Sequence, residues 1–302
     1  MDTRTQMSLQ ALKEKTDGHA TEGRWSEAID AVTESIRMCE SNLGGSPGDL
    51  AAHAEALEIR ADLLRQTGDN RRACEDYLAA IGKLEARDDC LIQLGRLHAG
   101  LGAAYVDLGE ADMAASQWEH SIECFERNDP PSPLDVAAMA NNFGFLKQNA
   151  GEFDAAETAF LKAMEILHSE LGEGDEETAT VASNLGALYQ VAGHHEPACN
   201  MHAIALKARA ALFGDNHPDT AQSNRDLGIA LSMTGDRTAA RRHLEKALHA
   251  YEMLGEESLA DLEEVALHYC DLLREDGEIS MAEAVKNRVQ DLVDLVDGKS
   301  AA

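Results

Sequence analysis

Apolar residues recur along this chain three and four positions apart, which is the spacing that gives a helix one apolar face. A glycine separates one such segment from the next, and successive glycines of this kind stand 41 to 45 residues apart. They are Gly23, Gly68, Gly109, Gly151, Gly193, Gly235 and Gly277. A glycine ends a helix at little cost because it adopts the left-handed backbone conformation. The pattern therefore predicts a repeated helical hairpin with a glycine at each turn.

A small residue follows each hinge glycine at a fixed distance. Five positions after the glycine the residue is always alanine: Ala28, Ala73, Ala114, Ala156, Ala198, Ala240 and Ala282. Seven positions further on the residue is Ser, Ala or Val in every repeat. We expect the alanine to lie in the seam between the two helices of the hairpin, where a larger side chain would overpack at a cost of roughly 1–3 kcal/mol.

Four repeats carry a second glycine inside the first helix, seven residues before the hinge: Gly102, Gly144, Gly186 and Gly228. A glycine in a helix interior costs about 1 kcal/mol relative to alanine. We expect close approach of the second helix to compensate that cost.

These residues carry a resemblance to a known family. Leu101-Gly102-x-x-Tyr105 and Leu185-Gly186-x-x-Tyr189, each followed by Gly, Ala and a large residue, resemble the tetratricopeptide repeat. The repeat here is 42 residues long, and the segment Asp215-Asn216-His217-Pro218-Asp219-Thr220-Ala221 is similar to repeats of the kinesin light chain type. Asn141-Asn142-Phe143-Gly144 and Asn184-Leu185-Gly186 agree with that type. The resemblance covers residues 90–296 well and residues 5–89 in weaker form.

The resemblance implies an all-α tetratricopeptide-type solenoid, a right-handed superhelix of about seven hairpins. We predict a single solenoid over residues 1–296 and a flexible tail at 297–302. The expected hairpins are 8–40, 52–86, 90–127, 133–171, 175–213, 217–254 and 258–296. The first and last repeats depart from the pattern and are predicted caps, since the outer faces of a stack meet water. The connections at 41–50 and 127–135 are unusual, and they are either hinges of the array or merely longer loops.

In the solenoids that this resemblance implies, the first helix of each hairpin lines a concave face that binds a peptide or protein. The fifth, sixth, ninth, twelfth and thirteenth places of each repeat point toward the groove. The candidate partner-binding residues at these places are Asn141, Asn142, Phe145, Gln148, Asn149, Asn184, Gln190 and Arg225. Most are amides, which can bond a peptide backbone as donors and as acceptors. An ordinary polar helix face in water is the competing explanation.

The thirteenth place also decides against one mode of recognition. A clamp for the acidic C-terminus of a chaperone needs Lys or Arg there, whereas this chain has Asp107, Asn149, Val191 and Met233. A kinesin light chain also carries heptad-patterned sequence ahead of its repeats, and none precedes Trp25. Motor attachment by that route is not expected. The resemblance extends instead to a bacterial kinesin light chain-like protein and to a partner from a tubulin-like cytoskeleton.

Charge and composition limit the classes of partner that the chain can bind. With 26 Lys and Arg against 55 Asp and Glu, the formal net charge is −29, so nucleic-acid phosphates and anionic membrane surfaces would be repelled. A basic partner suits this charge. The chain shows no secretory leader and no apolar run long enough for a membrane span, so we expect it in the cytoplasm. Its six cysteines stand singly, as in a reducing compartment.

No catalytic or cofactor motif appears, and no cofactor is expected. His195 and Cys199 have the i, i+4 spacing of metal ligands, but His195 and His202 occupy places that are apolar in other repeats, so core packing is the preferred interpretation. A non-enzymatic adaptor or scaffold is therefore the leading functional hypothesis. A regulatory peptide sensor that acts through another protein stays open, as does an enzyme or metal protein of unfamiliar design.

Overall fold

The computed structural model describes residues 3–42 and 47–300, and every regular element within those ranges is helical. The α-helices of the first half are α1 (Thr3–Thr21), α2 (Trp25–Asn42), α3 (Pro47–Gln66), α4 (Asn70–Leu84), α5 (Leu91–Asp107), α6 (Ala111–Arg127) and α7 (Pro133–Asn149). Those of the second half are α8 (Phe153–Glu170), α9 (Glu176–Val191), α10 (His195–Phe213), α11 (Pro218–Thr234), α12 (Arg237–Leu254), α13 (Leu259–Glu275) and α14 (Ile279–Ser300). Short 3₁₀ turns precede α5 and α13. The predicted all-α fold is confirmed.

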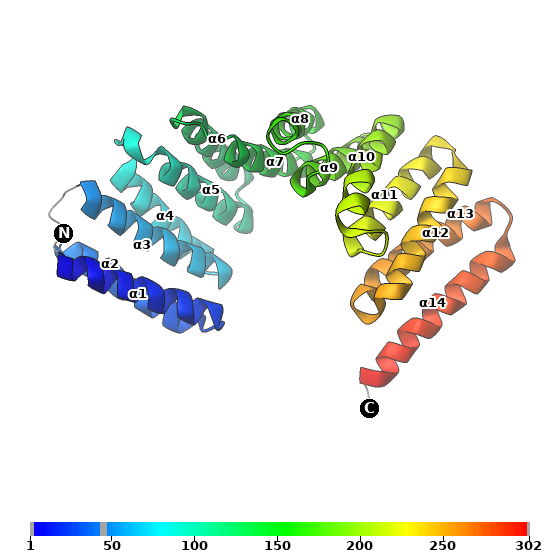
Figure 1. The fold of residues 1–302 in the computed structure, drawn as a ribbon, viewed down its shortest axis with the longest axis horizontal. Coiled ribbons are helices and arrows are strands. Elements are labelled where there is room, and N and C mark those ends of the chain that lie inside the picture. The colour runs from blue at the N-terminus through cyan, green and yellow to red at the C-terminus, as the bar shows by residue number, and fades with distance from the viewer. Residues whose placement is uncertain (1–2, 43–46, 301–302) are drawn as a thin grey trace. The chain divides into compact units, whose positions relative to one another are not determined.

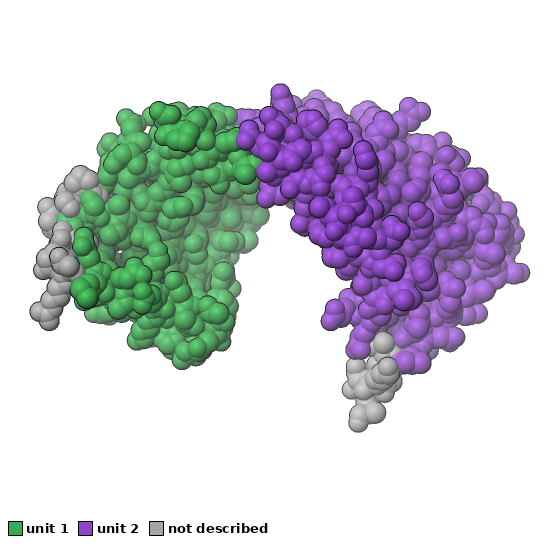
Figure 2. Space-filling view, in the orientation of Figure 1, with its two compact units in different colours: residues 1–146 green, residues 147–302 purple. Residues whose placement is uncertain are grey.

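The chain forms two compact units, residues 1–146 and residues 147–302 (Figure 2). In the first unit the hairpins are α1/α2, α3/α4 and α5/α6, and in the second they are α9/α10, α11/α12 and α13/α14 (Figure 1). The boundary falls within α7. One continuous solenoid over residues 1–296 stays a prediction. Helix α14 runs into the expected tail as far as Ser300, and residues 43–46 of the unusual 41–50 connection lie outside the described residues.

The hinge glycines have the predicted conformation. All seven have a positive φ, between 70° and 87°. At Gly235, which caps α11, φ is 87° and the amide donates to the Ser232 carbonyl at 3.1 Å. An L-residue with a side chain would be strained there, because its Cβ crowds the backbone. The spacing of these glycines therefore fixes where each first helix ends.

Small residues in the seams let the paired helices approach closely. All seven of the alanines that follow the hinges are 0% exposed. A Cβ added to Gly186 of α9 would stand 2.6 Å from Cε1 of His202 in α10, and one added to Gly228 of α11 would stand 2.8 Å from Cγ of Leu244 in α12. The predicted close approach is confirmed in these hairpins, since neither site has room for a methyl group.

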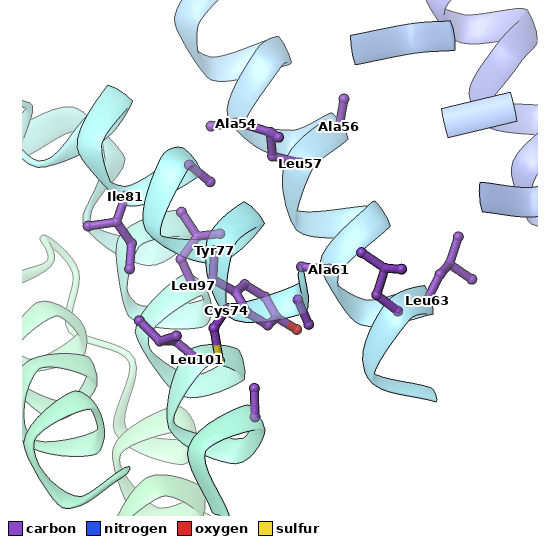
Figure 3. Packing of buried hydrophobic residues seen from close by; sticks show 14 of the residues in the cluster. Ala54, Ala56, Leu57, Ala61, Leu63, Cys74, Tyr77, Ile81, Leu97 and Leu101 are labelled. Carbon is purple, nitrogen blue, oxygen red and sulfur yellow. The ribbon is translucent and has the colours of Figure 1, made fainter. Parts of the chain in front are cut away.

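Large side chains fill the spaces that these small residues leave open. In the first unit Tyr77 of α4 reaches toward Ala61 of α3 and packs over Gly100 of α5 (Figure 3). Leu97 and Leu101 of α5 belong to the same buried cluster. In the next hairpin the Trp118 indole of α6 packs on Gly102 of its partner helix α5 and donates to the Ala99 carbonyl at 3.1 Å.

The interior is not equally apolar along the chain. One hydrophobic cluster comprises residues between Ala28 and Ala114, and a second comprises residues between Ala221 and Val289. Between these clusters, the α9–α11 interior holds buried polar side chains: Thr178, Ser183, His202, Arg209, Thr220, Ser223 and Asn224. Polar groups in a core need hydrogen-bond partners, so the contacts of these side chains bear on how the repeats of this stretch are joined.

Candidate partner-binding face

The first helix of each hairpin supplies the residues that the sequence assigned to a groove. On α7, Asn141 and Asn142 are half-buried and Phe145 is exposed, and all three belong to the first unit. Gln148 and Asn149 lie on the last turn of α7 in the second unit, and Oε1 of Gln148 is buried without a hydrogen-bond partner. The eight predicted residues are thus divided between two units, and the structure does not gather them into one described site.

Within the second unit, α9 and α11 are neighbours, and α9 carries Asn184 and Gln190 half-buried at the surface. An amide in that state keeps part of its hydrogen-bonding capacity turned outward. Arg225 of α11 stands at the fifth place of the next repeat, but its guanidinium is already engaged. Arg225 therefore differs from the amides, whose side chains are half-buried at the surface.

The Arg225 guanidinium pairs with three carboxylates: Glu264 at 2.8 Å, Asp226 at 3.1 Å and Asp261 at 3.5 Å. Burial lowers the pKa of Arg225, but the nearby Asp226 and Glu264 carboxylates raise it and the net shift is upward. Because Glu264 and Asp261 belong to α13, the arginine ties α11 to the following hairpin. Its first role is to join repeats, and a partner would contact an arginine that is already neutralised.

Two exposed apolar side chains accompany the amides. Val191 ends α9 and is 65% exposed, and Met233 lies one repeat later on α11 and is 49% exposed. Both occupy the thirteenth place, where sequence reasoning considered only the absence of a cation. Large exposed apolar residues beside amides give a surface that can bury a partner's side chains and also bond its backbone. Their fixed 42-residue spacing was the signal that could have identified them.

The first unit holds a cavity that the sequence did not indicate. Its volume is about 300 Å³, and α1, α2 and α3 line it with Gln6, Leu9, Gln10, Lys13, Ser35, Gly48, Asp49, Ala52, Glu55, Ala56 and Ile59. Lys13 and Ile59 occupy the fifth and sixth places of their repeats. The Lys13 ammonium pairs with Glu55 at 2.6 Å, and that hydrogen bond raises the pKa of Lys13. The degenerate first repeat hid this cavity, because its residues do not match the pattern.

Two of the buried polar side chains of the α9–α11 interior, His202 and Arg209, lie on the second helix α10. His202 of α10 takes a place that Tyr77, Trp118 and Leu244 fill elsewhere, and neither of its ring nitrogens has a hydrogen-bond partner. Burial lowers the pKa of His202, so the neutral imidazole is the favoured form. His202 therefore acts as a packing residue, in agreement with the prediction that packing accounts for it.

Arg209 lies two turns further along α10 and is buried. It donates to Ser223 Oγ of α11 at 3.0 Å and to Thr180 Oγ1 of α9 at 3.4 Å. Among the described residues it pairs with no carboxylate. It therefore joins three helices through hydroxyl groups alone. The same place holds Leu84, Phe125, Leu167 and Tyr251 in other repeats, so the pattern itself marks Arg209 as unusual.

No metal site forms within the ranges that the structure describes, since no three residues of the types His, Cys, Asp and Glu gather as ligands there. All six cysteines are free. None of the described helices is long and apolar enough to cross a membrane. The candidate face offers amides for hydrogen bonding and apolar side chains that a partner could bury.

Comparison with known proteins agrees with this architecture. Residues 135–203 and 198–253 match the family model described as Tetratricopeptide repeat. No curated protein sequence matches the chain. Among solved structures, BtubC (BKLC) from P. vanneervenii is 25% identical with a TM-score of 0.65, over 76% of this chain and 92% of that one.

More distant structures share the fold over a greater length. The apo form of RapI is 12% identical with a TM-score of 0.64, over 96% of this chain and 99% of that one. The C-terminal part of a TPR repeat-containing protein from Cytophaga hutchinsonii is 15% identical with a TM-score of 0.66, over 92% and 93% of the two chains. Residues 135–253 are therefore tetratricopeptide repeats, and the chain has the fold class of a tetratricopeptide α-solenoid.

Proposed function

We propose that this protein is a non-enzymatic scaffold or adaptor that binds an extended peptide segment of a partner protein across the first helices of its repeats. The observation that carries the proposal is the surface of α9 and α11: half-buried Gln190 and exposed Val191 lie on the last turn of α9, and exposed Met233 stands at the place equivalent to Val191 on α11. A surface of this kind can bond a peptide backbone and bury its side chains at the same time.

Charge favours a basic partner. The net charge of −29 attracts cationic segments at long range and raises the rate of encounter, and added salt weakens that attraction. Acidic groups also dominate locally at Arg225, where three carboxylates surround one guanidinium at a proposed binding place. The other sequence-predicted residues, which lie on α7 and α9, are proposed as further partner contacts of the helices that carry them: Asn141, Asn142, Phe145, Gln148, Asn149 and Asn184.

The finer proposal is a kinesin light chain-like adaptor whose partner belongs to a tubulin-like cytoskeleton. Two observations support it. The segment at 215–221 is similar to that repeat type, and BtubC (BKLC) has the same fold at 25% identity over most of its length. The cytoplasm is the compartment that fits an adaptor of this kind.

Two exposed methionines of the second unit provide a matched test. Met233 lies on the proposed face of α11, and Met253 lies on α12 and is 65% exposed. The purified chain would select binders from a displayed library of random peptides, and titration calorimetry would measure the selected peptides. We expect Met233→Ser to weaken binding by about 5-fold or more, through loss of buried apolar area.

Met253→Ser should leave the same affinity unchanged. Selected peptides should also be enriched in Lys and Arg, and their association rate should fall as salt is added. Equal affinity in wild type and Met233→Ser, with both variants folded by circular dichroism, would move the binding face away from α9 and α11.

A further inference from the structure

The last described hairpin carries an open groove between α13 and α14. The groove encloses about 310 Å³ and is lined by Glu263, Ala266, Leu267, Cys270 and Arg274 of α13 with Lys286, Val289 and Gln290 of α14. Leu267 is 58% exposed. The groove lies entirely within the second unit, and its lining includes none of the residues proposed above for partner binding.

The repeat register identifies what this groove is built to hold. Subtracting 42 from each lining position gives Ala221, Asn224, Arg225, Gly228, Ser232, Leu244, Ala247 and Leu248 on α11 and α12. Helix α13 packs against that hairpin, and Ala221, Leu244, Ala247 and Leu248 are buried there in one cluster with Leu262 and Val265 of α13. The α13/α14 groove is therefore the seat of a following first helix, and α14 is the last helix that the structure describes.

We propose that this groove binds an amphipathic α-helix of a partner protein, which docks as the next first helix of a repeat would. The interior equivalents show the fit: α11 packs on α10 and α13 packs on α12 in the same register. A helix-in-groove contact of this kind is read through residues three and four positions apart.

The residues by which the last hairpin differs from the preceding one indicate the chemistry of the helix that would bind. Lys286 stands where α12 has Leu244, it is exposed, and its ammonium makes no ion pair among the described residues. Arg274 also lines the groove, and its guanidinium pairs with Asp271 at 3.0 Å and with Glu283 at 3.6 Å. The occupant therefore needs an apolar stripe against Ala266, Leu267 and Val289, with a carboxylate facing Lys286. Because Arg274 is already paired and Glu263 adds a carboxylate to the lining, the charge that selects the occupant is that of Lys286, and it favours a helix with a carboxylate at that point.

The sequence of α13 itself supplies the probe, because that helix fills the equivalent groove one repeat earlier. A fluorescent peptide of residues 259–275, with Ser in place of Cys270, carries Leu262, Val265 and Leu272 on its apolar face and is acidic overall. Fluorescence anisotropy would follow its binding to the full chain. We expect saturable binding that Leu267→Glu weakens by about 10-fold or more and that Lys286→Glu also weakens.

Met253→Glu provides the control, since it adds the same charge at an exposed apolar site outside the groove. It should leave peptide affinity unchanged, and circular dichroism should show all three variants folded. Absence of saturable binding, or equal weakening by Met253→Glu and Leu267→Glu, would overturn the proposal. If sedimentation showed that the chain alone dimerises and that Leu267→Glu makes it monomeric, the occupant would be a second copy and not a partner's helix.

Discussion

The imidazole of His202 lies directly against the backbone of Gly186, with Cε1 2.6 Å from the point where a Cβ on that glycine would stand. The contact joins α9 to α10 inside one hairpin. It also shows how the repeat works: a missing side chain on one helix receives a ring from the next.

Replacing Gly186 by Ala should destabilise the second unit by roughly 1–3 kcal/mol, because the added methyl group would force the His202 ring or the helices apart. Urea unfolding would measure the change. Gly82 in α4 is the control, since a Cβ there meets no atom within 4 Å. Gly82→Ala should leave stability unchanged or raise it by about 0.5–1 kcal/mol, through the better helix propensity of alanine. Equal effects at both glycines would contradict the packing account.

Ala198, which is 0% exposed in the seam of α9 and α10, should tolerate no larger residue. We expect Ala198→Leu to lower the free energy of unfolding by about 1–3 kcal/mol through overpacking. Glu173 is exposed in the preceding loop, so Glu173→Leu should change stability by less than about 0.5 kcal/mol. If both variants melted at the wild-type temperature, the assignment of Ala198 to the seam would be wrong.

Stability should fall in mild acid partly because of His202. Burial lowers its pKa in the folded state, so below the ordinary value of about 6.5 the unfolded chain binds a proton that the folded chain resists. The contribution of His202 is thus present in full above that value and is lost as the pH falls toward the lowered one. Asp226 opposes the shift, and Arg209 adds to it.

His202→Leu should therefore reduce the pH dependence of the unfolding free energy between about pH 8 and pH 5 by up to one proton. Denaturant titrations at a series of pH values would show it. The same pH dependence in wild type and variant would mean that the ring titrates normally in the folded protein.

Arg209 allows a test of how hydroxyl partners support a buried cation. Arg209→Leu restores the residue found at this place in the repeats of Leu84 and Leu167, and we expect stability to stay the same or rise by about 1–4 kcal/mol. Arg209→Ala should be less stable than Arg209→Leu, since it leaves a cavity. A large loss in the leucine variant would show that the bonds to Ser223 and Thr180 contribute more than the buried charge costs.

Asn142 and Gln190 test the amide part of the proposed face. Replacing both by Ala should raise the dissociation constant of a selected peptide roughly 5- to 150-fold, because each lost backbone hydrogen bond is worth about 0.5–1.5 kcal/mol. The calorimetric titration would be repeated at two salt concentrations, since charge attraction should respond to salt and the amide contribution should not. Unchanged affinity in a folded double variant would place peptide recognition elsewhere.

The sequence by itself determined the helices, their hinges and the seams. Gly235 and its equivalents end the first helices because only glycine adopts positive φ at little cost, and Ala198 and its equivalents mark the closest approach of each pair. These are local or nearest-neighbour requirements that recur in each hairpin. A period of 42 residues makes these requirements recognisable in a single sequence, because every repeat needs the same residue types at the same places.

Only the tertiary structure decided what the surface residues do. Arg225 stands at a predicted binding place, yet its guanidinium is held by α13, and Arg209 reaches two neighbouring helices at once. The cavity lined by α1, α2 and α3 and the open groove on α13/α14 are formed by side chains of different helices. Such contacts depend on which side chains of different repeats face each other. The sequence period cannot predict those pairs, because it describes the residues of each repeat separately.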